Sequence, residues 1–261
     1  MKQILLTSLL CLFWGLAFSQ TMFNSNFEET SFKMRVKQLD EFFNRFNYEK
    51  DMEDKTILNK QDTAMRKRYI FNLFNRELFL KLNDSLKQEY MTFVETVISP
   101  QQPVYLHFTD SNWQAEAICQ ATFQGKPIQI SLFLKTDTVN SKEYKWAIYS
   151  VDGDIFKLIP AKQNPGIRIS PVDNELGFMN LPDIAKGDVC RNIMNYSVNT
   201  FSVDKLSVFN TLVYYGLLKI DYVRKIVYHF EQVPGYIFSV EHFERNTDNV
   251  GWLISNIKIK Q

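Results

Sequence analysis

The clearest pattern in the chain is an alternation of apolar and polar residues that occurs twice, at 128–151 and at 236–257. Each stretch is divided by a polar segment, so each predicts two long antiparallel strands joined by a loop. Four alternate positions on each first strand would share one face: Ile128, Ile130, Leu132 and Leu134 in one stretch, and Tyr236, Phe238, Val240 and His242 in the other.

Further similarities suggest that the two stretches are copies of one unit. A phenylalanine, a short turn and a proline precede each, at 123–127 and 230–234. Each second strand carries a tryptophan and, two positions later, an isoleucine: Trp146 with Ile148, and Trp252 with Ile254. We therefore expect two related halves in tandem. The alternative is that two amphipathic hairpins resemble each other by chance.

Helical periodicity precedes the first hairpin. Apolar residues step by three and four from Phe32 to Phe46, which predicts one helix. Asp62 is expected to cap a second helix that runs to about residue 78. Ser85 and Gln88 form a capping box for a third helix, which ends before Pro100.

The remaining elements complete a helix-then-strand order in both halves. Strands are predicted at Val104 to Phe108, Trp113 to Phe123 and Lys219 to Glu231. A helix is predicted after Ser202, with Gly216 near its end. The fold class is therefore α+β, with helices followed by a curved antiparallel meander in each half.

The first 19 residues have the features of an export signal. Lys2 provides the positive charge at the start, and Ile4 to Phe18 form the apolar run. Ala17-Phe18-Ser19 has the small-x-small pattern of a signal-peptide cleavage site. We expect a protein of the periplasm, the cell surface or the extracellular space. No later segment reaches 18 consecutive apolar residues, so no transmembrane segment is expected after cleavage.

The rest of the chain is expected to fall into two halves and a connection. The segment between them contains four prolines and two glycines, which is typical of a linker, although an ordered active-site loop has the same composition. The predicted boundaries are 1–19 for the signal, 20–159 for the N-terminal half, 160–182 for the connection and 183–261 for the C-terminal half.

Composition excludes some functions. Removal of Lys2 leaves 29 basic and 29 acidic residues, so charge gives no reason to bind nucleic acid or an anionic membrane. Aromatic residues make up 15% of the chain, which favours a packed core over disorder.

The helix FKMRVKQLDEFFNRFN and the closing strands YIFSVEHFERN and GWLISNIKIK resemble the nuclear-transport-factor-two-like and cystatin-like α+β group. They also resemble uncharacterised exported proteins of Gram-negative bacteria. The resemblance implies a sheet that bends around a helix to form a cone with an apolar pocket. Some members are isomerases or dehydratases with a histidine or aspartate on the pocket wall, and many only bind or dimerise.

Candidate catalytic chemistry is limited to one pair. His242 and Glu244 are on the same side of a predicted strand, where they would form a base and its orienting carboxylate. The alternative is a solvent-facing polar strip. No Cys-x-x-Cys, His-x-His or glycine-rich phosphate motif occurs, so neither a metal nor a cofactor is expected.

Tryptophan and cysteine supply the other candidates. Trp113, Trp146 and Trp252 have wide faces that suit an apolar or sugar ligand, although alternation with isoleucine favours the core for the last two. Cys119 and Cys190 are a candidate disulfide pair in an oxidising compartment, with a buried thiol as the alternative.

Two functions follow from these residues. The first is an exported, non-catalytic binding or assembly module that recognises a protein or a small apolar ligand, or forms a homodimer. The alternative is an isomerase- or dehydratase-type enzyme with an acid/base residue in a cone-shaped pocket.

Overall fold

The protein is an α+β protein, as predicted. The computed structural model describes residues 34–36, 39–51, 53–140, 143–157, 203–245 and 247–260, and isolated positions between 178 and 198. Its helices are α2 (Leu39–Phe46), α3 (Thr63–Asn72), α4 (Arg76–Leu80), α5 (Asp84–Ile98) and α6 (Lys205–Tyr214), with the 3-10 helix η1 (Asp154–Phe156). Its strands are β1 (Met34–Val36), β2 (Trp113–Phe123), β3 (Lys126–Asn140), β4 (Glu143–Asp152), β5 (Leu218–Phe230), β6 (Tyr236–Phe243) and β7 (Asn249–Ile259).

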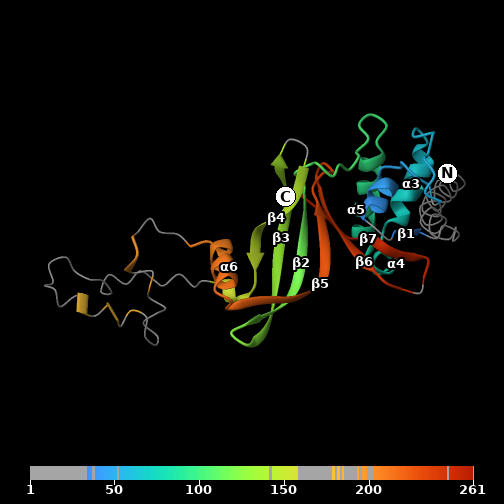
Figure 1. Ribbon diagram of the computed structural model, residues 1–261. Helices are drawn as coiled ribbons and strands as arrows, with labels where there is room; N and C mark the ends of the chain where they lie inside the picture. The colour runs from blue at the N-terminus through green and yellow to red at the C-terminus, as the bar shows by residue number, and fades with distance from the viewer. Residues whose placement is uncertain are drawn as a thin grey trace, which may run out of the picture. The chain divides into compact units, whose positions relative to one another are not determined.

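The strands follow the order β1-β7-β6-β5-β2-β3-β4 (Figure 1). Two meanders, β2-β3-β4 and β5-β6-β7, are therefore adjacent through their first strands. β6 is antiparallel to both β5 and β7, whereas β1 is parallel to β7. A register shift between Ser239 and Val240 leaves Ser255 of β7 without an opposite residue, which is a β-bulge.

The chain divides into two compact units. Unit 1 comprises the described parts of Met1–Glu116, Lys135–Trp146 and Ile226–Gln261. Unit 2 comprises those of Ala117–Leu134 and Ala147–Lys225.

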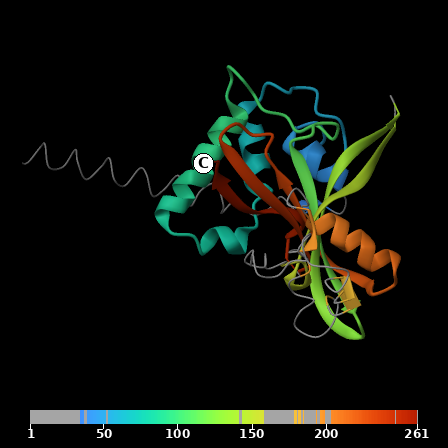
Figure 2. The same ribbon diagram turned by 90° about the vertical axis from the view of Figure 1, so that its left-hand side faces the viewer.

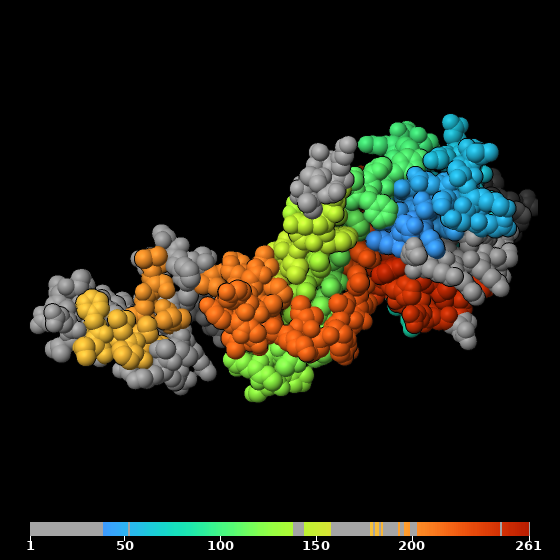
Figure 3. All heavy atoms as spheres, viewed as in Figure 1, coloured from blue at the N-terminus to red at the C-terminus, as the bar shows by residue number. Residues whose placement is uncertain are grey.

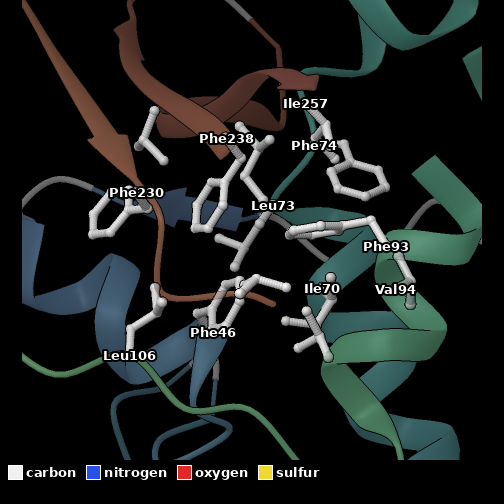
Figure 4. Packing of buried hydrophobic residues seen from close by; sticks show 14 of the residues in the cluster. Phe46, Ile70, Leu73, Phe74, Phe93, Val94, Leu106, Phe230, Phe238 and Ile257 are labelled. Carbon is white, nitrogen blue, oxygen red and sulfur yellow. The ribbon is translucent and has the colours of Figure 1, made fainter. Parts of the chain in front are cut away.

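The core of unit 1 is a continuous set of aromatic rings. Phe238 stacks between Phe46 of α2, at 5.7 Å between ring centroids, and Phe230 of β5, at 4.9 Å (Figure 4). Phe93 of α5 meets Phe238 edge-on at 5.4 Å. Helices α4 and α5 lie beside strands β6 and β7 (Figure 2). Face-to-face and edge-on rings bury large apolar areas together, so these elements hold each other in place.

Three helix predictions need correction. Residues 34–36 are not helical, because their backbone pairs with β7 from Asn249 to Gly251. The second helix is divided into α3 and α4, since Leu73 O accepts from Ile254 N and Asn75 N donates to Ile254 O. Asn83, rather than the predicted Ser85, caps α5 by accepting from Leu86 N. In contrast, Asp62 caps α3 as predicted.

The predicted strand from Val104 to Phe108 is wrong, because this segment joins no ladder in the described structure. Side chains hold it instead. Asn47, itself buried, donates to Leu106 O at 2.9 Å and accepts from Leu106 N at 2.7 Å. Arg66 Nη2 donates to Val104 O. These bonds satisfy buried backbone groups that a neighbouring strand would otherwise satisfy.

Unit 2 has a smaller core beneath α6. Phe209 of α6 meets Phe156 at 6.2 Å between ring centroids, and Leu218 is buried with them. Asp204 caps α6 by accepting from Ser207 N at 2.8 Å. Gly216 follows the helix with φ +69°, a conformation that favours glycine, so the predicted end of the helix is confirmed.

Several predictions cannot be compared with the structure. The signal at 1–19, nearly all of the connection at 160–182, and Cys190 lie outside the described residues. None of the described helices is long and apolar enough to cross a membrane.

Candidate functional site

Unit 1 brings the three candidate tryptophans together in one row of rings, which we call the aromatic strip. It consists of His242, Trp252, Tyr228, Trp113 and Trp146. Successive ring centroids along this row are 5.3, 5.0, 5.9 and 4.9 Å apart. These separations lie within the range in which aromatic side chains attract each other.

The strand order explains why these side chains meet. His242 of β6 is the register partner of Trp252 of β7. Tyr228 lies on β5, the other neighbour of β6, and Trp113 begins β2, the next strand in the sheet. Residues separated widely along the chain therefore form one row.

The strip is anchored in the core at Trp113. This side chain is only 3% exposed, and its ring stacks on Phe230 at 5.4 Å with an angle of 9° between the planes. Its indole Nε1 donates to Phe108 O at 3.0 Å. Trp113 is thus a buried, hydrogen-bonded side chain on which Trp146 and Tyr228 pack.

The strip reaches solvent at Trp146. This side chain is 41% exposed, although it packs on Trp113 and lies 6.4 Å from Tyr228. Trp252 and Tyr228 are partly buried against the unit 1 core, as the alternation with Ile254 predicts for Trp252. The core prediction for Trp146 is therefore wrong, since a large part of its surface remains accessible.

Polar hydrogens lie along the accessible part of the strip. The donors are the indole N–H groups of Trp146 and Trp252 and the hydroxyl of Tyr228. Within the described part of the chain none of the three has a hydrogen-bond partner. Burial raises the pKa of Tyr228 above its ordinary value, so the hydroxyl stays protonated and remains a donor. The strip thus combines apolar ring faces with donors.

The evidence for a function of the strip is its geometry and its chemistry. No family model, curated protein or solved structure matches this chain. The α+β fold and the strip are accordingly the starting point for a functional proposal.

His242 and Glu244, the candidate catalytic pair, have different surroundings. The imidazole of His242 is exposed and packs edge-on against Trp252. Glu244 is exposed and follows the last residue of β6, and in the described structure no hydrogen bond joins it to His242. His242 therefore belongs to the aromatic strip, because its imidazole ring packs against Trp252.

A second polar cluster was not predicted. His229 Nε2 lies 3.0 Å from Glu116 Oε2, and Nδ1 lies 3.0 Å from Ser239 Oγ. A neutral imidazole would donate to the carboxylate and accept from the serine hydroxyl. Because neighbouring strand residues point to opposite faces, His229 lies on the face opposite Tyr228. The three residues come from separate strands, so their sequence spacing gave no signal.

Serine side chains extend this polar cluster across β6 and β7. Ser255, at the bulge, has one hydroxyl hydrogen with two acceptors within reach: Glu241 Oε1 at 2.9 Å and Ser239 O at 3.3 Å from its Oγ. The polar groups of this face are therefore connected to each other, which is typical of a cluster that specifies strand pairing.

Cysteine and metal chemistry add no further site. Cys119 is 1% exposed on β2, and burial raises the pKa of its thiol, which disfavours the reactive thiolate. Its predicted bridge to Cys190 stays a prediction. Among the described residues, no three His, Cys, Asp or Glu side chains are grouped so that they could hold a metal ion.

Proposed function

We propose that this protein is an exported, non-catalytic binding module that holds a ligand against the aromatic strip of unit 1. The observation that carries the proposal is Trp146, a large aromatic side chain that is well exposed yet fixed by the buried Trp113. Large exposed apolar side chains that are held rigidly favour binding, because little side-chain entropy is lost when a ligand covers them.

The chemistry of the strip favours a ligand that is largely apolar and carries acceptor oxygens. Its ring faces provide apolar contact, and the donors of Trp146, Trp252 and Tyr228 would pair with oxygen atoms at the ligand's edge. The rings are inclined to each other by 38° to 74°. A ligand whose shape lets it contact inclined rings is therefore favoured over a flat ligand that would need coplanar rings.

The proposal includes an evolutionary relation between the two meanders and membership of the nuclear-transport-factor-two-like and cystatin-like group. The adjacency of β2 and β5 as first strands of successive meanders supports duplication. Alternate apolar residues of β3 and β6 enter cores in both copies, for example Ile130 and Phe238, which supports it further.

Fluorescence titration tests the binding site. The probe is 1-anilinonaphthalene-8-sulfonate, which has an apolar body and sulfonate oxygens. We expect Trp146→Ala to weaken probe binding about tenfold, since loss of one aromatic contact costs ~1.5 kcal/mol. Tyr214→Ala is the matched control, because Tyr214 is an exposed aromatic residue outside the strip. Unchanged affinity in Trp146→Ala, or equal loss in the control, contradicts the assignment.

Export is tested separately from binding. We expect the protein expressed with its own first 19 residues to be recovered outside the cytoplasm with Gln20 at its N-terminus. Intact mass measures the cleavage. Retention of an uncleaved chain in the cytoplasm rejects export and leaves the binding site as proposed.

A further inference from the structure

His242 lies at one end of the aromatic strip, beside Trp252 and near the end of β6. Its side chain is exposed, and Figure 3 shows part of the β6–β7 region, in red, at the molecular surface. Within the described residues, the one contact of the imidazole is the ring of Trp252, and neither ring nitrogen has a hydrogen-bond partner. Both nitrogens therefore have hydrogen-bonding capacity that a ligand on the strip can use.

The imidazole adds a charge that the rest of the strip lacks. The tryptophans offer neutral indole N–H groups, and Tyr228, the residue that β5 contributes, offers a hydroxyl. Burial raises the pKa of Tyr228, so this hydroxyl stays neutral. An imidazole ordinarily titrates at about pH 6.5 and carries a positive charge in mildly acidic solution. The strip therefore has one position, at its end, that can become cationic.

The elements packed around His242 bring no charge into contact with it. On β7, its register partner Trp252 is flanked on the same face by Val250 and Ile254, which carry no charge. Glu244, two positions beyond His242, is exposed, and the described structure contains no ion pair between them. Exposed charges that do not touch are screened by salt and interact weakly. Glu244 therefore does not occupy the imidazole.

We propose that the ligand of the aromatic strip is an organic acid with an apolar body, and that His242 selects its anionic group. This inference rests on the binding function proposed above and adds a charge to the ligand. The apolar body covers the ring faces, while the protonated imidazole donates to a carboxylate at the end of the strip. The neutral donors of the strip bind acceptor oxygens of charged and uncharged ligands alike, so His242 is the residue that separates the two classes.

Two probes with the same ring system and different charge test the inference: 1-naphthaleneacetate and its neutral amide, 1-naphthaleneacetamide. A carboxyl group is ionised above about pH 5 and an imidazole is charged below about pH 6.5, so the opposite charges coexist between these values. At pH 5.5 we expect the acetate to bind the mature chain about threefold more tightly than the amide, which is the strength of an exposed ion pair. At pH 8 the two probes should bind equally. Isothermal titration calorimetry measures both affinities.

Variants assign this preference to one side chain. His242→Gln should bind the acetate and the amide equally at both pH values, because it cannot become charged. His242→Lys should prefer the acetate at pH 8 as well, since an ammonium group keeps its charge there. His107→Gln, the matched change at an exposed histidine outside the strip, should keep the native ratio at both pH values. Each comparison uses the ratio of two affinities, so a loss of ring contact that weakens both probes cancels.

The outcomes distinguish this inference from the binding function on which it rests. If Trp146→Ala weakens both probes but the native chain binds them equally at pH 5.5, the strip binds ligands and the inference about His242 is overturned. A preference for the acetate that persists in His242→Gln also overturns it. Tighter binding of a cationic probe, 1-naphthylmethylamine, assigns selection to Glu244 and overturns it as well. If neither probe binds, or Trp146→Ala binds both as the native chain does, both proposals are overturned.

Discussion

The two units use their apolar residues differently. In unit 1, helices α2, α3 and α5 cover the strands, and phenylalanine rings stack from Phe46 through Phe238 to Phe230. In unit 2, α6 covers a smaller core around Phe209, while the beginning of β5 stays exposed on both faces.

This difference between the two units distinguishes apolar residues that stabilise the fold from apolar residues that remain available to bind another molecule. A core closed by the chain's own helices stabilises the fold, because its apolar surface is removed from water on folding. Apolar side chains left exposed gain this stabilisation only when another molecule covers them. Trp146 in unit 1 and Val223 in unit 2 belong to the second class.

The largest expected effect is at Phe238. We expect Phe238→Ala to lower the free energy of unfolding by about 4 kcal/mol, and Phe209→Ala in unit 2 by about 3 kcal/mol. The difference reflects the closer and more numerous ring neighbours of Phe238. Urea denaturation followed by circular dichroism measures both. Phe238→Leu, which retains most of the volume, serves as the control. A larger loss at Phe209 would contradict the contrast between the units.

An intermediate effect is expected at Asn47. Asn47→Ala leaves both backbone groups of Leu106 without their partner, which costs about 2 kcal/mol of unfolding free energy. Asn44→Ala, a neighbouring helix position, provides the comparison. Hydrogen exchange at the Leu106 amide should be faster in Asn47→Ala. An unchanged exchange rate would show that another group satisfies this amide.

The smallest effect is expected at Asp204, the cap of α6. Hydrogen bonds from the Ser207 hydroxyl and backbone lower the pKa of Asp204 below its ordinary value. A carboxyl with a lowered folded-state pKa stabilises the protein above its unfolded pKa, which is about 4. This stabilisation is lost as the pH falls through the lower folded pKa.

Asp204→Ala should therefore lower the melting temperature slightly at pH 7 and leave it unchanged once the native carboxyl is protonated. Melting followed at several pH values measures this difference. Asp204→Asn should retain part of the cap without the pH dependence. An equal effect of Asp204→Ala at pH 7 and at pH 2 would contradict the role of the charge.

Local patterns predict the bounds of two long strands well. The predicted strand from Trp113 to Phe123 has the observed bounds of β2, and the prediction for β5 differs by one residue at each end. Alternation accounts for β2, whose buried residues all lie on one face, whereas β5 is exposed on both faces from 219 to 226.

Contacts between distant residues account for the errors. Residues 34–36 form a strand because β7 provides an edge, and α3 ends because Leu73 and Asn75 bond to Ile254. The candidate tryptophans were recognised by residue type. Their assembly around Tyr228 depends on the strand order, which the sequence pattern leaves undetermined.

Strand β7 has a consequence for biosynthesis. Its residues pair with segments about 180 and 215 positions earlier, since Ile254 bonds to Leu73 and Asn249 pairs with Met34. During translation the helices of unit 1 exist long before their last strand leaves the ribosome. Folding with such distant pairing is slow. We expect the nascent chain to keep its phenylalanines accessible to chaperones until β7 is made.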